Sequence, residues 1–387
     1  MAFEGWHIAF LHQDFPFSGA EQVTLSVANY LCTRGHKVTI LTVSHHQHLY
    51  AEGTEQLFDV HLLPQGHVKR SRYIEGAVRN FILCQKVGVL VTYRQLLYAK
   101  RLKRHTGVKM VFELHNTPYY EFLDIADKRR ESKLKNLFYG CGVERLLRFF
   151  YLQKHRRVYG WCDAYGLLCK GYQQQLVKDL ALNPLDNKTW VLPNPVRQEE
   201  HIVMEKEKVV VYIGRLTHRD KRVDRLLRIW QTARPGMPGW QLKIVGWGKA
   251  AGRLKKLSED LHLQDVSFEG HTSRVKDYYD KAAILCMTST FEGWPMCIAE
   301  GQANGVVPVL FNSYAGAADL VSDSQEGILV QPYDEAAFAR QLAALAADEA
   351  RLAAMRRSVI VKAGSYSLER TGKVWEEMLR HIISTDV

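Results

Sequence analysis

The sequence predicts an α/β protein with two domains, each a doubly wound sheet of parallel strands. Short apolar runs alternate with amphipathic helical segments along the chain, which is the pattern that βαβ units produce. The chain has 387 residues, which is long for a single hydrophobic core and comfortable for two. The net charge of +11 arises entirely within residues 1–197, and a Pro-Asn-Pro turn closes that half. We therefore place a domain boundary near residue 197.

The first domain, residues 1–197, opens with a βαβ unit. His7–Leu11 predicts a buried strand, Ala20–Thr33 has helical periodicity, and Lys37–Val43 predicts the next strand. Such a unit implies parallel strands with a right-handed crossover. Gly19 lies in the loop at the carboxyl edge of the first strand, where open α/β sheets bind ligands, and is a candidate for a phosphate loop. The motif is weak, because the full G-x-G-x-x-G pattern is absent.

Further strands of this domain are predicted at Gly88–Thr92 and Lys109–His115, with a basic helix at Leu96–His105 between them. His115 lies at the carboxyl tip of its strand and precedes a turn that contains a proline. A histidine at this place is suited to face a ligand cleft. The same position also fits a histidine that merely closes the strand.

Residues 128–157 are strongly basic. They carry ten Lys or Arg side chains against two Glu, and eight Leu or Phe residues are interleaved with them. Basic residues mixed with large apolar ones indicate an interfacial helix pair that lies on anionic lipid. The alternative is a pair of helices that pack on a core and expose basic faces. We expect no nucleic acid partner, because no recognised binding module is present.

The cysteine pattern and the chain's start both bear on the compartment. The seven cysteines form no C-x-x-C pair and no cluster with zinc spacing, which predicts reduced thiols in a cytoplasmic setting. The first residues lack a basic stretch followed by an apolar one, so they predict a strand rather than a signal peptide. No apolar run approaches the roughly 20 residues that cross a bilayer. We expect a cytoplasmic protein, with peripheral attachment to the inner face of the cytoplasmic membrane as an open alternative.

The second domain, residues 198–367, repeats the alternation of strands and helices, and residues 368–387 form a separate closing helix. Several of its predicted strands run into a glycine followed by a charged side chain, so these side chains gather at one edge. The predicted strands include Val209–Ile213, Gln241–Val245, Ala282–Met287 and Val306–Phe311.

The stretch TSTFEGWPMCIAEGQAN, residues 288–304, is the principal candidate site. It predicts a turn after a buried strand, then a helix over Met296–Ala303 for which proline is a favourable start. Glu292 then lies on the loop and Glu300 inside the helix, with the N–H groups of the helix start between them. Acceptors for sugar hydroxyls are thus expected beside donors for phosphate. On spacing alone, two glutamates with no shared task remain the alternative. The candidate donor-sugar and phosphate loop comprises Gly293, Trp294, Pro295 and Met296.

A second group of candidates follows the strand Val209–Ile213. Arg215 offers a bidentate fork for phosphate, and Lys221 offers a point charge. With the helix start after Glu292 they could hold a diphosphate and stabilise it as a leaving group. Glu300 could accept both hydroxyls of a ribose, because a carboxylate has two oxygens. An ordinary surface ion pair is the alternative for Arg215.

The segment Gly246-Trp-Gly-Lys-Ala-Ala251 favours a different ligand. It follows a predicted strand, opens toward a helix and matches G-x-G-x-x-A, and Glu269 lies at roughly the distance expected for a dinucleotide-binding acid. An NAD(P)-binding enzyme is therefore an alternative. The position in the middle of the second domain and the basic face of the next helix count against it.

Taken together, these residues resemble the retaining, nucleotide-sugar-dependent glycosyltransferases of family four, which have the GT-B architecture. The most specific landmark is the E-x7-E signature, here Glu292-Gly-Trp-Pro-Met-Cys-Ile-Ala-Glu300. The other landmarks span nearly the whole chain in the family's order, and they are Gly19-Ala-Glu21, Arg34-Gly-His36, Leu192-Pro-Asn-Pro195, Gly214-Arg-Leu216 with Lys221, Leu242–Gly248 and Val266–Gly270.

The resemblance implies two Rossmann-like domains that face each other across a cleft, with the helix at 368–387 crossing back to the first domain. It implies that the first domain binds the acceptor and the second the nucleotide sugar. By this resemblance the nucleotide is bound by Arg215, Lys221, Gly246 and Glu300, and the catalytic residues are His115 and Glu292, of which Glu292 holds the donor sugar.

The family's chemistry is a front-face attack with the leaving phosphate as base, so the resemblance implies neither a metal ion nor another cofactor. We expect a hexose or N-acetylhexosamine donor, with UDP as the nucleotide, and an acceptor that is lipid-linked or part of a bacterial surface polysaccharide such as lipopolysaccharide. The pair Trp294-Pro295 departs from the family's usual residues, which leaves the donor sugar open. Because the GT-B frame also carries nucleotide-sugar epimerases, an epimerase remains an alternative.

Overall fold

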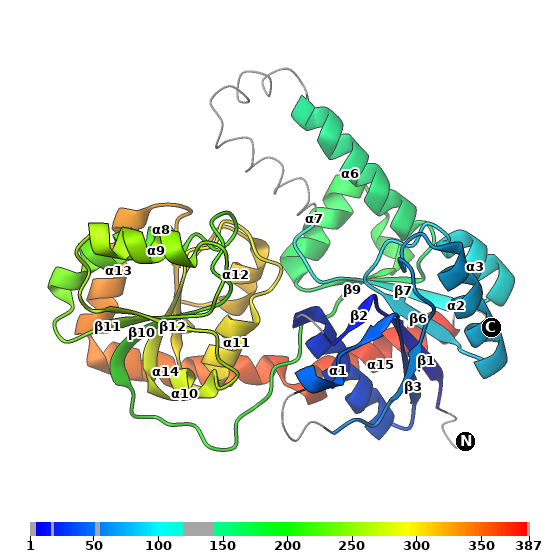
Figure 1. Cartoon of the computed structure of the whole chain (residues 1–387), viewed down its shortest axis with the longest axis horizontal. Helices are drawn as coiled ribbons and strands as arrows, with labels where there is room; N and C mark the ends of the chain where they lie inside the picture. The colour runs from blue at the N-terminus through cyan, green and yellow to red at the C-terminus, as the bar shows by residue number, and fades with distance from the viewer. Residues whose placement is uncertain (1–4, 17–18, 51–54, 119–142, 385–387) are drawn as a thin grey trace. The chain divides into compact units, whose positions relative to one another are not determined.

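The computed structural model describes residues 5–16, 19–50, 55–118 and 143–384. The chain divides into two compact units (Figure 1). Unit 1 contains the chain up to Pro118, Arg145–Pro195 and the final segment from Leu368, and Val196–Ser367 belongs to unit 2. The two ends of that unit 2 segment are adjacent, because the N–H of Val196 bonds to the carbonyl of Tyr366 at 2.7 Å.

Unit 1 is built on a seven-stranded parallel sheet with the order β5-β3-β1-β6-β7-β8-β9. Its strands are β1 (His7–Leu11), β3 (Lys37–Thr42), β5 (Asp59–Leu62), β6 (Val89–Thr92), β7 (Lys109–Leu114), β8 (Ala164–Leu167) and β9 (Thr189–Val191). The central strands are almost entirely buried, because helices cover both faces of the sheet. A two-stranded parallel sheet also joins β2 (Asp14–Phe15) to β4 (Ser44–His45).

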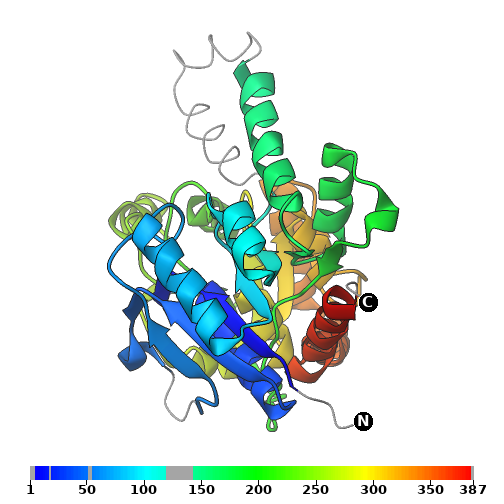
Figure 2. The same cartoon turned by 90° about the vertical axis from the view of Figure 1, so that its right-hand side faces the viewer.

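The helices of unit 1 lie on both faces of its sheet, with α2 and α3 on one face and α15 on the opposite one (Figures 1 and 2). They are α1 (Gly19–Thr33), α2 (Arg72–Gln85), α3 (Ala99–Thr106), α6 (Val143–Tyr159), α7 (Lys170–Leu180) and α15 (Leu368–Ser384), with short 3₁₀ turns at Gln47–Leu49 and Pro184–Asp186. The final helix is therefore an integral part of unit 1.

The apolar face of α15 packs against α1 and the sheet. Trp375 is buried with its ring 5.9 Å from that of Phe10 in β1. Glu376, also buried, pairs with Arg34 at 2.6 Å. Gly372 allows the close approach to α1, because a Cβ at this position would lie 2.2 Å from a ring carbon of Tyr30.

Unit 2 is built on a six-stranded parallel sheet with the order β12-β11-β10-β13-β14-β15. Its strands are β10 (Glu207–Ile213), β11 (Gln241–Val245), β12 (Val266–Gly270), β13 (Ala282–Met287), β14 (Val307–Phe311) and β15 (Ile328–Val330). Its helices are α8 (Val223–Ala233), α9 (Ala251–Asp260), α10 (Lys276–Lys281), α11 (Met296–Ala303), α12 (Ala315–Leu320), α13 (Glu335–Ala347) and α14 (Glu349–Ala363), with 3₁₀ turns at Arg234–Gly236 and Gly364–Tyr366. One core of buried aliphatic and aromatic side chains, including Trp230 and Phe338, fills the space between sheet and helices.

Each sheet has a point at which the strand order reverses, between β1 and β6 in unit 1 and between β10 and β13 in unit 2. Loops that leave the carboxyl ends of the strands at such a point diverge and open a ligand-binding crevice. In unit 2 these loops are residues 214–222 and 288–295, which include the E-x7-E start. The fold therefore brings two separate sequence candidates to one edge.

The predicted fold class, α/β with two doubly wound parallel sheets, is confirmed. The sequence pattern predicts neither β5 nor the helices α2 and α14. Strand β5 lies at the edge of its sheet and exposes His61 and Leu62, so it lacks a clear apolar run. The helix predicted at Leu96–His105 begins only at Ala99.

The basic segment at 128–157 is described only in part. Residues 143–157 belong to α6, and residues 128–142 lie outside the described residues. Six of the seven cysteines are described, and all six are free thiols. Within the described ranges, no helix combines the length and apolar character needed to cross a membrane.

The α1–α15 contact predicts a stability effect at Gly372. Gly372→Ala should destabilise unit 1 by about 1–3 kcal/mol, because the new methyl group overlaps the Tyr30 ring. The matched control is Gly76→Ala in α2, where an added Cβ meets nothing within 4 Å and should stabilise by about 0.5–1 kcal/mol. Urea denaturation measures both, and equal stability of the two variants would contradict the packing described here.

Candidate active site

The carboxyl edge of the unit 2 sheet carries most of the predicted site residues. Arg215 and Lys221 lie in the loop that follows β10, Gly246 follows β11, and Glu292 follows β13. Glu300 lies within α11, one turn after the helix start. These residues come from three strand ends that are neighbours in the sheet.

Gly246 is required by a close approach between two loops. It has a φ of +137°, and a Cβ at this position would lie 1.9 Å from the carbonyl oxygen of Gly214. The same two loops are joined by backbone bonds, from the N–H of Gly214 to Val245 at 3.0 Å and from that of Leu216 to Trp247 at 2.8 Å. The glycine thus fixes the loop that carries Arg215 against the loop after β11.

Lys221 and Glu292 form an ion pair. Lys221 Nζ lies 2.6 Å from Glu292 Oε1, and Ser289 Oγ donates to the same oxygen at 2.7 Å. Their side chains are only 13% and 12% exposed. Burial alone would lower the pKa of Lys221, but the nearby Glu292 carboxylate outweighs it and the pKa is raised. The resemblance assigns the two side chains to different parts of the donor, whereas here they neutralise each other.

Glu300 points toward the side chain of Tyr279 at the end of α10. The Tyr279 hydroxyl donates to Glu300 Oε2 at 2.9 Å. Burial raises the pKa of Glu300, and the bond from Tyr279 opposes this shift. One of the two carboxylate oxygens expected to accept ribose hydroxyls is therefore engaged by tyrosine.

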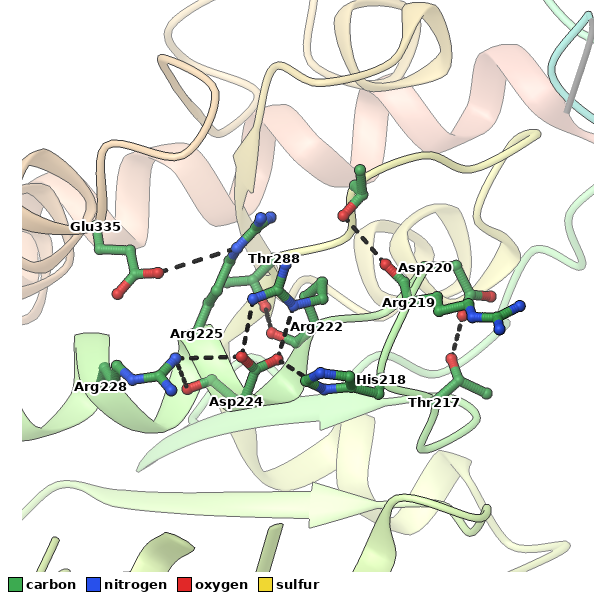
Figure 3. A network of polar contacts seen from close by, with 11 residues as sticks. Thr217, His218, Arg219, Asp220, Arg222, Asp224, Arg225, Arg228, Thr288 and Glu335 are labelled. Carbon is green, nitrogen blue, oxygen red and sulfur yellow. Dashed lines mark hydrogen bonds and ion pairs between the residues drawn. The ribbon is translucent and has the colours of Figure 1, made fainter. Parts of the chain in front are cut away.

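The loop after β10 is anchored to the loop after β13. Thr288 Oγ1 donates to the carbonyl of Arg222 at 2.9 Å, and the N–H of Thr290 donates to the carbonyl of Asp220 at 2.7 Å. Thr290 Oγ1 also reaches the carbonyl of Arg219 at 3.2 Å. Figure 3 shows Thr288, just after β13, next to the backbone of Arg222. The hydroxyl residues that open the 288–304 stretch thus hold the basic loop in place.

Asp224, in the first turn of α8, compensates the charge of this loop. It accepts from Arg222 Nε at 2.9 Å and from Arg228 at 3.1 Å, and His218 lies 3.9 Å away (Figure 3). Burial would raise the pKa of Asp224, but the arginine bonds outweigh it, and the pKa is lowered. Two of the basic side chains in the loop, His218 and Arg222, are therefore turned toward an internal carboxylate.

Arg215 differs from these internal cations. Its side chain is 74% exposed and approaches Asp220 only at 3.8 Å. Arg225, by contrast, lies with its guanidinium 4.2 Å from the centre of the Tyr333 ring and close to Glu335 (Figure 3). In this loop Arg215 is thus the cation placed to meet a soluble anion.

The loop before α11 presents backbone rather than side chains. Trp294 is buried, donates from its indole N–H to Asp319 at 3.1 Å and packs edge-on against Tyr366. Pro295 is the N-cap of α11 rather than its first residue, and no side chain caps this helix. The N–H of Ile298 donates to the carbonyl of Pro295 at 3.1 Å, so the N–H groups of Met296 and Cys297 are the ones left for a ligand. The carbonyl of Gly293 packs on Gly316, and a Cβ on Gly316 would lie 2.8 Å from that carbonyl oxygen.

The dinucleotide alternative has less support in the structure. Glu269 lies in β12, but Ser267 donates to one of its oxygens at 2.5 Å and Tyr278 to the other at 3.1 Å. Both oxygens that would bind a ribose are thus already used. Trp247, between the glycines of the fingerprint, is 65% exposed and is an aromatic surface at the same edge.

In unit 1, His115 lies directly after β7 and pairs with Glu113, whose Oε2 is 3.1 Å from His115 Nε2. Burial alone would lower the pKa of His115, but Glu113 outweighs it, with help from Glu21 and the Asn194 side chain, and the pKa is raised. His115 Nδ1 is buried without a hydrogen bond partner among the described residues. Glu113 therefore favours the protonated form of the ring, whereas burial opposes it.

A second histidine, His12, lies in the same cluster, and its pKa is shifted in the opposite direction. Burial lowers the pKa of His12 to about 3, although Glu21 lies 4.0 Å away. The Tyr93 hydroxyl donates to Glu21 at 2.7 Å, and its ring lies beside both histidines. The sequence reading missed His12, Tyr93 and Glu113. Their position just after β1, just after β6 and near the end of β7 is the signal that could have indicated them.

Gly19, the predicted phosphate-loop residue of unit 1, is the first residue of α1 and is exposed. A Cβ at this position would meet nothing within 4 Å. Packing within the described part of the chain therefore gives no reason for glycine here.

Two family models together match almost the whole chain. The model for "Glycosyltransferase Family 4" matches residues 17–200, and that for "Glycosyl transferases group 1" matches residues 196–362. The chain belongs to the family-four glycosyltransferases of the GT-B type. This glycosyltransferase is 28% identical over 355 residues to a relative from Campylobacter jejuni. The match covers 88% of this chain and 89% of the relative. The relative is the GalNAc-alpha-(1->4)-GalNAc-alpha-(1->3)-diNAcBac-PP-undecaprenol alpha-1,4-N-acetyl-D-galactosaminyltransferase.

Solved structures show the same fold. The lipopolysaccharide outer core galactosyltransferase WaaB matches with a TM-score of 0.72 and 17% identity over 97% of the glycosyltransferase and 99% of that chain. HepE from Anabaena, in complex with UDP and glucose, matches with a TM-score of 0.74 and 15% identity over 97% and 100% of the two chains.

The charge network around Asp224 predicts a pH-dependent stability. Asp224→Asn should cost about 2 kcal/mol at neutral pH, because it leaves Arg222 and Arg228 without their shared partner. The folded-state pKa of Asp224 is lowered, so its contribution is present above the ordinary carboxyl pKa and is lost as the pH falls through the folded value. The difference in the free energy of unfolding between the wild type and Asp224→Asn, measured by urea denaturation, should therefore become smaller as the pH falls.

The matched control is Asp277→Asn, which removes an exposed aspartate 3.4 Å from Arg274. Such a pair contributes under about 0.5 kcal/mol. If Asp224→Asn were as stable as this control at neutral pH, the anchoring role of Asp224 would be wrong.

Proposed function

We propose that this glycosyltransferase moves a hexose or N-acetylhexosamine from a UDP-sugar to a lipid-linked or surface-polysaccharide acceptor, with retention of anomeric configuration. The observation that carries the proposal is the edge of the unit 2 sheet, where an exposed arginine, a lysine–glutamate pair and an uncapped helix start lie together. Phosphate and sugar hydroxyls require this combination of cations, N–H donors and carboxylates.

The donor would be bound in segments by unit 2. Arg215 and the N–H groups at the start of α11 would hold the diphosphate, and Glu300 would accept a ribose hydroxyl. The exposed ring of Trp247, beside Gly246, would stack on the base. The diphosphate would draw Lys221 away from Glu292, which would then accept hydroxyls of the sugar. The bound UDP and glucose of HepE support this choice of donor.

The mechanism we propose uses the leaving diphosphate as the base for the acceptor hydroxyl. The charge that develops on the leaving group is met by Arg215, Lys221 and the α11 N-terminus, so no metal ion is needed for this purpose. His115 takes part in transfer as a cation held by Glu113. Retention is tested by the anomeric proton signal of the first-formed product, and inversion would reject this mechanism. Activity lost in EDTA and restored by a divalent cation would reject metal independence.

The acceptor class rests on relatives and on charge. The C. jejuni relative acts on a diphosphate-linked undecaprenol glycan, and an E. coli relative, 26% identical over 200 residues, is a lipopolysaccharide 1,6-galactosyltransferase. That second match covers 48% of this chain and 53% of the relative. The basic excess of residues 1–197 supports an anionic acceptor or a lipid surface for unit 1.

A donor panel tests the nucleotide. UDP and UDP-sugars should raise the melting temperature, whereas GDP-sugars and NAD should not. Arg215→Ala should weaken UDP binding about 10- to 100-fold, because a charge-assisted bond to phosphate is lost. The control is Arg340→Ala, an exposed arginine in α13. Calorimetry gives both affinities, and stabilisation by NAD alone would reject the proposal in favour of a dinucleotide enzyme.

Transfer and donor binding can be separated at His115. His115→Gln keeps a donor toward Glu113, so UDP affinity and melting temperature should stay unchanged. Transfer should fall by roughly 100-fold or more, because a cation near the reacting groups is lost. The matched control is His105→Ala, an exposed histidine in α3. Full transfer by His115→Gln would contradict a catalytic role, and weaker UDP binding would mean that His115 acts on the donor site.

A further inference from the structure

Unit 1 contains a groove that lies outside the predicted site. The groove has a volume of about 610 Å³ and lies between residues 95–97, the start of α3 and the C-terminal half of α6. This volume is within the range of pockets that take one small molecule. It is therefore large enough to hold part of a single ligand, rather than being a flat surface.

The rim of the groove is cationic. Lys69, Lys100, Lys154 and Arg157 line it, and no acidic residue does. Among the described residues, no carboxylate pairs with Lys69, Lys100 or Arg157, and the Lys154 ammonium lies 5.6 Å from the centre of the Tyr151 ring. This differs from unit 2, where the loop cations have an internal aspartate. Four cations around one groove indicate an anionic ligand.

The same groove also exposes large apolar side chains. Leu97 is 74% exposed and Phe150 is 60% exposed, and both line the groove above the buried ring of Trp161. Such side chains next to a cationic rim fit a ligand that carries both a phosphate and a hydrocarbon chain. A free sugar phosphate would leave Leu97 and Phe150 uncovered.

The groove is held in a fixed shape by contacts at both ends. The N–H of Leu97 donates to the carbonyl of Lys69 at 3.0 Å, which joins two of its walls. Lys103 Nζ pairs with Asp163 at 2.6 Å and reaches the carbonyl of Trp161 at 3.4 Å, which ties α3 to the end of α6. Little ordering is therefore needed when a ligand binds.

The loop after β6 connects the groove to the histidine cluster of unit 1. Tyr93 at its start bonds to Glu21 and contacts His115, whereas Gln95 and Leu97 line the groove. Only one residue, Arg94, separates the two regions along the chain. One short stretch of chain therefore links the groove to the histidine cluster.

We propose that this groove binds the phosphate and the first part of the hydrocarbon chain of a lipid-linked acceptor. The proposal rests on the acceptor class proposed above and assigns the residues that recognise it. Lys69, Lys100 and Arg157 bind the phosphate oxygens, and Leu97 and Phe150 cover the chain. The occupant is a single acceptor molecule rather than bulk anionic phospholipid, because the cations surround a groove of molecular size.

The test measures binding of a short acceptor mimic without any donor. Farnesyl diphosphate should bind the full chain more tightly than inorganic diphosphate, and farnesol should bind weakest, as measured by calorimetry. Lys100→Glu combined with Arg157→Glu should weaken farnesyl diphosphate binding at least ten-fold. The matched control is Arg79→Glu with Lys178→Glu, which makes the same change of charge at exposed positions of α2 and α7. Leu97→Ser should weaken the binding of farnesyl diphosphate and leave the affinity for inorganic diphosphate unchanged.

Three results would overturn the proposal. The first is equal binding of farnesyl diphosphate by the groove variant and the control variant. The second is equal affinity for farnesyl diphosphate and inorganic diphosphate, which would mean that only phosphate is recognised. The third is loss of binding to phosphatidylglycerol vesicles in the groove variant while farnesyl diphosphate binding persists, which would assign the cations to bulk lipid. UDP binding by the same variants reports separately on the donor site, so failure of one proposal is distinguishable from failure of the other.

Discussion

The ion pair between Lys221 and Glu292 joins the two loops that leave the switch point of the unit 2 sheet. Both side chains are largely buried, so a ligand that removed only one of them from the pair would leave a buried charge uncompensated. A nucleotide sugar carries both groups that are needed, a diphosphate for the lysine and hydroxyls for the glutamate. Neither inorganic phosphate nor a free sugar does. In the function proposed above, the pair would thus favour the complete donor over either of its parts.

Charge is distributed in the same way in both units. Cations that tie parts of a unit together are compensated inside the protein, as Asp224 compensates Arg222 and as Asp163 compensates Lys103. Cations that face an open surface have no strong partner, as with Arg215 in unit 2 and Lys100 in unit 1. Compensated charges cost little to bury, whereas uncompensated ones remain available to an anionic ligand. Lys221 combines the two roles in our proposal, because it is paired with Glu292 until the diphosphate draws it away.

The fold was predictable from the sequence, but the contacts of the candidate site residues were not. The period of the apolar runs predicted the strands around Arg215 and Glu292, and therefore their shared edge. The partners of Glu300 and Trp294, however, come from α10 and from α12 and the turn after α14, far away in the sequence. Trp294 is an example, because its indole is buried and donates to Asp319. A contact of this kind depends on how helices pack and leaves no periodic trace in the sequence.

The contact of Gly246 with the carbonyl of Gly214 limits which substitutions this site can accept during evolution. It is a contact between two backbones, so no substitution at either position can adjust it gradually. Neighbours such as Arg215 and Trp247, whose side chains are exposed, can change without moving the loops. The edge of the sheet thus combines a fixed backbone contact with exposed side chains that can be replaced. Exposed side chains at this edge can therefore vary while the backbone contact stays the same.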